Sequence, residues 1–275
     1  ELHLLPTLWF RNTWSWKPGK PRPRISADPA RPGQVLARHR HLEPFALYHE
    51  PAEALLFTEN ESNAPRLWGV GAGGPFKDAF DDAVVRGNAG ALSATTEGSK
   101  FAPHHRARVG PGETWTVRLR LSNRLDLADP FGADFDATFE HRRQEADAFY
   151  HRVTPFPMPE DLRRVQRQAF AGLLWSKQWY HYSVRRWLDG DAAGPPPPPA
   201  RRQGRNHDWP HFDAADVLSM PDKWEYPWFA AWDMAFHCVA FALIDAEFAK
   251  QQLTLLTREW YMHPNGQIPA YEWAF

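Results

Sequence analysis

The sequence has almost no cysteine. Cys238 is the one cysteine among 275 residues, so the chain cannot form an internal disulfide or a cysteine metal cluster. The fold must therefore be held together by packing. A reducing compartment such as the cytoplasm is the expectation.

An excess of charge of either sign is also lacking. The chain carries 32 basic and 33 acidic side chains, for a formal net charge of −1. This balance argues against a nucleic-acid or anionic-membrane partner bound by bulk charge. The longest apolar run, Trp228 to Ile244, contains Asp233 and His237. Because charges at the middle of a bilayer are costly, this run predicts a buried helix, and no membrane span is expected.

Several motifs of group transfer are missing. There is no Gly-x-Ser-x-Gly elbow and no Walker-type phosphate loop. The glycine run Gly69 to Gly74 leads into Pro75, and no helix follows that could present amides to a phosphate, so a plain loop is expected. His207 and His211 lie near acids, but Pro210 breaks the helix that such a ligand pair would need. We expect neither a metal nor a cofactor.

Aromatic residues, in contrast, are abundant. Tryptophan occurs 14 times, and aromatics reach 14% of the chain, although the mean hydropathy is −0.59. Rings in such number form either the core or a binding surface.

The first part of the chain has the pattern of β-structure. Residues 114–121 alternate strictly between apolar and polar side chains, as in a half-buried strand. Weaker strands are predicted at Leu2–Phe10, Phe45–His49 and Glu53–Thr58. An antiparallel β-sandwich covering residues 1–130 is the simplest arrangement.

After residue 130 the period becomes helical. Residues 131–158 are expected to form a linker helix, Asp134 to His151, and a proline-rich connection. A second, all-α region is expected at 159–275, with a helix start at Pro159. Its predicted helices are Leu162–Leu188, Phe229–Ala249 and Phe248–Tyr261.

An aromatic loop leads into the second of these helices. Trp224, Tyr226 and Trp228 precede Trp232 and Asp233, the acid of the first helical turn. Sugar rings stack on flat aromatic faces while a carboxyl group reaches the glycosidic oxygen, so this stretch suits a carbohydrate. The alternative is a purely structural role, in which the negative charge of Asp233 stabilises the helix by lying at the positive end of its dipole.

Two further features have both a functional and a structural explanation. Trp175, Trp179 and Tyr182 follow a helical spacing and would form either a stacking wall or part of the core. His237, one turn after Asp233, would either orient that acid or be a core histidine.

The segment Trp232 to His237, followed by Asn265 to Glu272, resembles glycoside hydrolase family 63, the processing α-glucosidase I (mannosyl-oligosaccharide glucosidase) family. The opening segment Leu4 to Trp16 looks like the bacterial branch of that family. The resemblance implies a β-sandwich followed by an (α/α)6 toroid, and inverting hydrolysis of α-glucosidic or related bonds in an oligosaccharide or small glycoside.

The resemblance also implies roles for single residues. Asp233 matches the general acid, whereas the general base would lie beyond Phe275, so we expect this piece of a longer protein to be inactive alone. Glu272 matches a carboxylate near the substrate and would be either a binding residue or a loop anchor. Expected binding residues are Trp224, Tyr226, Trp228, Trp232, His237 and Glu272. The alternatives are a carbohydrate-binding protein without catalysis, or another toroid glycosidase of the trehalase or mannosylglycerate-hydrolase type.

Overall fold

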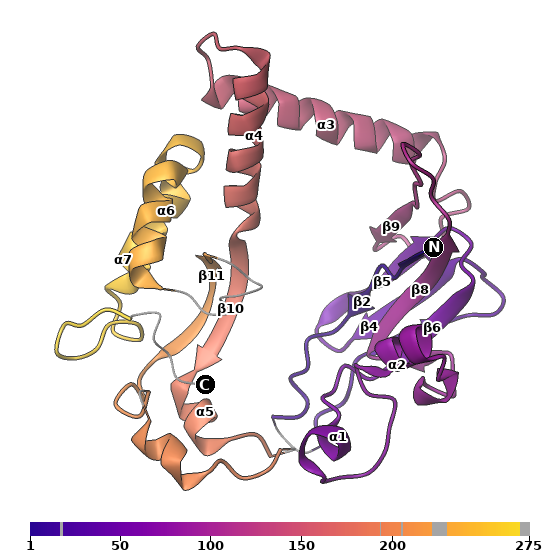
Figure 1. Cartoon of the computed structure of the whole chain (residues 1–275), viewed down its shortest axis with the longest axis horizontal. Helices are drawn as coiled ribbons and strands as arrows, with labels where there is room; N and C mark the ends of the chain where they lie inside the picture. Colours follow the sequence, from indigo (N-terminus) through magenta and orange to yellow (C-terminus); the bar gives the residue numbers. More distant parts are fainter. Residues whose placement is uncertain (17–18, 193, 205, 222–229, 270–275) are drawn as a thin grey trace. The chain divides into compact units, whose positions relative to one another are not determined.

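A computed structural model describes residues 1–16, 19–192, 194–204, 206–221 and 230–269. The chain divides into two compact units (Figure 1). The first comprises Glu1–Glu140 with Ala192–Pro195, and the second comprises His141–Asp191 with Pro196–Phe275. Antiparallel sheets fill the first unit, and most of the helices follow in the second.

Two antiparallel sheets form the first unit. In one sheet, β8 (Lys100–Ala107) pairs with β1 (Leu2–Leu4), β2 (Leu8–Trp9) and β6 (Ala54–Thr58). The other sheet has the order β7-β3-β4-β5-β9. Its strands are β7 (Glu97–Gly98), β3 (Arg24–Ala27), β4 (Gln34–His39), β5 (Leu42–His49) and β9 (Leu119–Ser122).

One buried cluster contains side chains of both sheets. Ile25, Val35 and Leu47 come from the five-stranded sheet, and Phe57 and Phe101 come from the sheet around β8. The rings of Phe57 and Phe101 lie 4.8 Å apart in a tilted arrangement. Short helices lie outside this cluster: α1 (Ala64–Trp68), α2 (Ala79–Arg86) and η1 (Ala89–Ala91).

The strands predicted at Phe45–His49 and Glu53–Thr58 are confirmed by β5 and β6. The strand predicted at 114–121 is wrong in its first part, because pairing begins only at Leu119. The Glu50 carboxylate accepts the backbone N–H of Arg118 at 3.0 Å and its Nε at 2.7 Å. The Glu50 side chain thus accepts the Arg118 N–H, which a neighbouring strand would otherwise have bound.

The second unit joins helices to a two-stranded antiparallel sheet. α3 (Ala133–Val153) crosses from the first unit, and α4 (Glu160–Trp175) begins after Pro159 as predicted. The other elements are β10 (Lys177–Ser183), α5 (Val184–Asp189), η2 (Pro199–Gln203), β11 (Asp213–Ser219), α6 (Ala231–Ile244) and α7 (Ala246–Leu256). The largest fully buried side chains of this unit are Tyr261, Phe212, Phe241, Leu218, Met234 and Val184.

The helix predicted over Leu162–Leu188, and with it the all-α second region, is wrong. α4 ends at Trp175, and the chain then pairs residue for residue with β11 from Lys177 to Ser183. Tyr180 is buried while its neighbour Trp179 is 56% exposed, as adjacent residues on opposite faces of a strand can be. Tryptophan and tyrosine favour strands when a partner strand is present, and this partner lies far along the chain.

The helices predicted over Phe229–Ala249 and Phe248–Tyr261 correspond to α6 and α7, but the boundary between them lies at Asp245, a few residues earlier than predicted. Asp245 leaves the helical conformation, and its carboxylate accepts the N–H of Phe248 at 3.1 Å as the cap of α7. The other carboxylate oxygen pairs with Lys177 Nζ. This hydrogen bond from Lys177 is the main reason why the pKa of Asp245 lies below its ordinary value.

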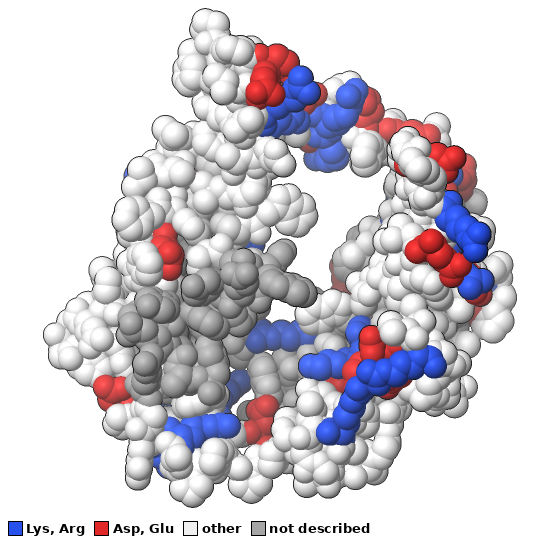
Figure 2. Space-filling view, viewed as in Figure 1, with Lys and Arg blue, Asp and Glu red and all other residues white. Residues whose placement is uncertain are grey.

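Charged side chains of both signs lie close to one another on the face drawn in Figure 2, as the balanced composition leads one to expect. Much of the drawn face of the second unit carries little charge. Among the described residues, no helix has the length and apolar character that a bilayer crossing requires.

Gly98 is the point at which a side chain would disrupt the first unit. A Cβ there would collide with the backbone of Thr58, including its carbonyl carbon at 3.0 Å. We expect Gly98→Ala to lower the free energy of unfolding by roughly 1–3 kcal/mol, as overpacking does. Gly73→Ala is the matched control, since a Cβ at Gly73 meets no atom within 4 Å. Equal denaturation midpoints for the two variants would contradict the close packing of β6 against β7.

Candidate functional site

Asp233 lies in the first turn of α6 and is half-buried. One face of this helix, including Met234, Cys238 and Phe241, is packed in the core of the second unit. The opposite face is apolar too, but Phe236 and Leu243 on it are 71% and 66% exposed. Asp233 is the only acidic residue of this helix, and His237 is the other strongly polar side chain among mostly apolar ones.

His237, one turn after Asp233, belongs to a polar chain that enters the core. Its Nδ1 lies 2.6 Å from Ser219 Oγ at the end of β11. Ser219 Oγ lies 3.0 Å from Ser176 Oγ, and Ser176 donates to the carbonyl of Leu173 at 2.6 Å. The histidine is thus tied to β11 and to the end of α4.

The protonation of His237 depends on two opposing effects. Burial lowers its pKa from the ordinary value, because the charged ring loses hydration. The negative charge of Asp233 acts in the opposite direction and raises the pKa of His237, but by less. The net shift is downward, so the neutral imidazole is favoured.

Gln252 of α7 fixes Ser219 from the other side. Its Oε1 accepts the Ser219 backbone N–H, and its Nε2 donates to the Val217 carbonyl, both at 3.0 Å. The amide therefore pairs with the free edge of β11 as a neighbouring strand would. Gln252 is 3% exposed, so few other groups could satisfy this edge.

The other predicted site residues are placed as follows. Trp224, Tyr226, Trp228 and Glu272 lie outside the described residues. Trp232 precedes Asp233 on α6 and is 53% exposed.

The helical stripe of Trp175, Trp179 and Tyr182 is wrong, because only Trp175 lies on α4. Trp179 and Tyr182 are on β10, three positions apart and hence on opposite faces. The Tyr182 hydroxyl accepts a hydrogen bond from the Asn206 amide at 2.8 Å.

Within the described part of the chain, His207 and His211 do not form part of a metal-binding group. The ring of His211 lies 5.5 Å from both Trp209 and His263, and burial lowers its pKa. Among the described residues, no group of three or more histidine, cysteine or acidic side chains is arranged to hold a metal. These rings pack the segment that follows α7 against the residues that precede β11.

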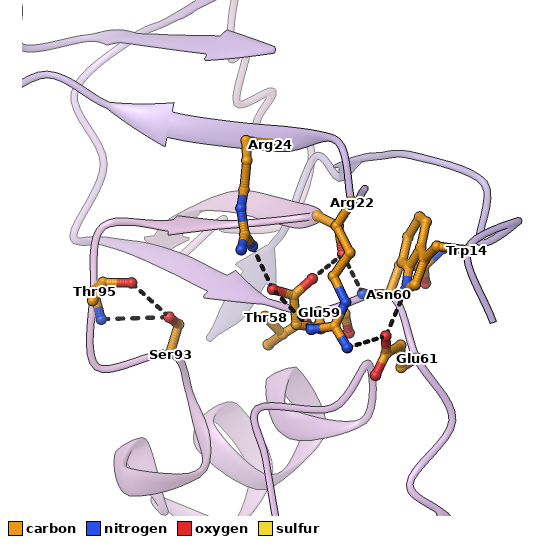
Figure 3. A network of polar contacts seen from close by, with 10 residues as sticks. Trp14, Arg22, Arg24, Thr58, Glu59, Asn60, Glu61, Ser93 and Thr95 are labelled. Atoms are coloured by element: carbon orange, nitrogen blue, oxygen red, sulfur yellow. Dashed lines mark hydrogen bonds and ion pairs between the residues drawn. The ribbon is translucent and has the colours of Figure 1, made fainter. Parts of the chain in front are cut away.

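A second polar cluster lies in the first unit (Figure 3). Glu61 accepts Trp14 Nε1 at 2.5 Å and pairs with Arg22 at 2.9 Å, while Glu59 pairs with Arg24 at 2.7 Å. Trp14 is 6% exposed. Each carboxylate in this cluster is thus ion-paired with an arginine, and the hydrogen bond from Trp14 ties the N-terminal segment to Glu61.

Sequence comparison finds one strong similarity. The uncharacterized protein YMR196W of Saccharomyces cerevisiae is 43% identical over 310 aligned positions, which include all of this chain and 28% of the yeast protein. The chain thus spans less than a third of the length of that relative. No family model matches the chain, and no solved structure matches it.

Ser176, Ser219 and Gln252 were not identified from the sequence. Ser219 is hydrogen-bonded to Ser176, 43 residues before it, and to Gln252, 33 residues after it. None of the three lies in a recognisable motif. Only the pairing of β10 with β11 brings them together.

Removal of the Gln252 amide tests this arrangement. Gln252→Leu leaves the Ser219 N–H and the Val217 carbonyl unpaired, and each such buried group costs about 1–3 kcal/mol. We expect a clear loss in the free energy of unfolding by urea denaturation. Gln251→Leu is the control, because Gln251 is exposed and its amide donates to the Glu247 carboxylate on the same helix at 3.4 Å. A Gln252 variant as stable as the control would show that β11 does not need this amide.

Proposed function

We propose that the chain is part of an inverting glycoside hydrolase that cleaves α-glucosidic or related α-linked bonds, with Asp233 as the general acid. The observation that carries the proposal is the position of Asp233: it is half-buried at the start of a helix with apolar faces, beside the exposed ring of Trp232. A proton donor in this setting can meet a sugar that stacks on aromatic rings.

The fold is proposed to be a β-sandwich followed by part of an (α/α)6 toroid. The cluster of Ile25, Leu47 and Phe101 supports the sandwich, since it joins side chains of both sheets. The exposed outer face of α6 supports the toroid, because Phe236 and Leu243 on it are apolar and apolar helix faces are usually buried. In a toroid, further helices of the longer protein cover such a face. The resemblance to family 63 adds to both arguments.

Inverting hydrolysis needs two carboxyl groups roughly 6.5–9.5 Å apart. One protonates the leaving oxygen, and the other activates a water molecule on the opposite face of the sugar. Asp233 fills the first role only. The proposal therefore requires a second carboxylate from the remainder of a longer enzyme, and it expects the 275-residue chain to be inactive alone.

Replacement of Asp233 in that longer enzyme tests the proposal. General acid catalysis contributes about 10²–10⁴-fold, so Asp233→Asn should lower kcat/KM by that factor on an α-glucoside with a poor leaving group. The loss should be much smaller on α-glucosyl fluoride, because fluoride leaves without a proton. Hydrolysis of both substrates is measured for the variant and the unmodified enzyme.

Glu247→Gln is the matched control, since Glu247 occupies the first turn of the next helix, α7, and is exposed. It should retain full activity. If Asp233→Asn slowed hydrolysis of both substrates equally with the fold intact, Asp233 would have only the structural role of stabilising the start of α6. If the unmodified enzyme bound the glucoside without hydrolysing it, the protein would be a carbohydrate-binding protein.

A further inference from the structure

The polar chain that ends at His237 has a fixed direction. It consists of three contacts: Leu173 carbonyl with Ser176 Oγ at 2.6 Å, Ser176 Oγ with Ser219 Oγ at 3.0 Å, and Ser219 Oγ with His237 Nδ1 at 2.6 Å. All three distances are those of hydrogen bonds. Each contact therefore needs one proton between its two atoms.

Counting these protons leaves one arrangement. A backbone carbonyl can only accept, so the Ser176 hydroxyl must donate to Leu173. Ser176 has no second proton, so Ser219 must donate to Ser176. Ser219 then has no proton left, and the third contact needs one from His237 Nδ1. Each serine accepts once and donates once, which suits a hydroxyl group.

We infer that Ser176 and Ser219 hold His237 in the tautomer that carries its proton on Nδ1, so that Nε2 is a hydrogen-bond acceptor one helical turn from Asp233. The two serines are positioning residues, since they act through the histidine. Gln252 supports them by holding the Ser219 backbone in place.

The consequence for chemistry rests on the proposed function. With its proton on Nδ1, His237 presents Nε2 as an acceptor, one helical turn from Asp233, for a hydroxyl proton of a bound sugar. The opposite tautomer would present a donor there instead.

Nitrogen NMR of the full chain, labelled with ¹⁵N in histidine, measures the tautomer directly. Protonated and unprotonated ring nitrogens resonate far apart, and the His237 signals are identified by their loss in His237→Gln. We expect the Nδ1–H form to exceed the Nε2–H form by about fivefold or more, as one net hydrogen bond implies.

Ser176→Ala provides the decisive comparison. Without Ser176 Oγ as its acceptor, the Ser219 hydroxyl can turn and donate to His237 Nδ1, so the proton should move to Nε2. Ser183→Ala, which removes another serine hydroxyl at the far end of β10, should leave the His237 signals unchanged. A wild-type chain with the proton on Nε2, or a tautomer ratio unaltered by Ser176→Ala, would overturn the inference.

The result does not depend on enzymatic activity. A chain with the Nδ1–H tautomer but no glycosidase activity in the longer protein would contradict the proposed function and leave the role of the serines standing. An active glycosidase with the proton on Nε2 of His237 would do the reverse.

Discussion

The burial of one face of α6 is the constraint on which the second unit depends. Met234 and Phe241 on that face are fully buried, and they fix the rotation of the helix about its axis. This rotation places Asp233 and His237 together at the border between the packed face and the exposed one. The ion pair of Lys177 with Asp245 then ends the helix and starts α7, which supplies Gln252 to the edge of β11.

The buried polar groups of this unit form hydrogen bonds whose donors and acceptors follow one order. The edge of β11 is paired by an amide side chain, and the serine at its end passes a hydrogen bond from His237 towards the backbone of α4. Buried polar groups without partners are costly, so such a chain restricts each member to one protonation state. The proposed acid therefore lies one helical turn from a histidine whose tautomer is determined by its hydrogen bond to Ser219.

The sequence predicted the local features well and the long-range ones poorly. Alternation revealed β5 and β6, and proline with acids revealed the start of α4. The strand β10 was not predicted, because Trp179 and Tyr182 fit a helical spacing, and their partners on β11 lie 38 and 32 positions further along the chain. Asp233 and His237 became candidates from the aromatic loop before them and from the family resemblance. Ser176, Ser219 and Gln252 come together only through the pairing of β10 with β11. The boundary between α6 and α7 lies at Asp245 and not at the predicted position near Phe248, because the ion-pair partner of Asp245, Lys177, lies far along the chain.

The configuration of the first product tests the central claim most directly. If the longer protein uses Asp233 with a distant base, ¹H NMR during hydrolysis of an α-glucoside should detect β-glucose first, before mutarotation produces the α-anomer. Initial release of α-glucose would contradict the account, because retention requires a nucleophile about 5–5.5 Å from the acid rather than a base across the cleft.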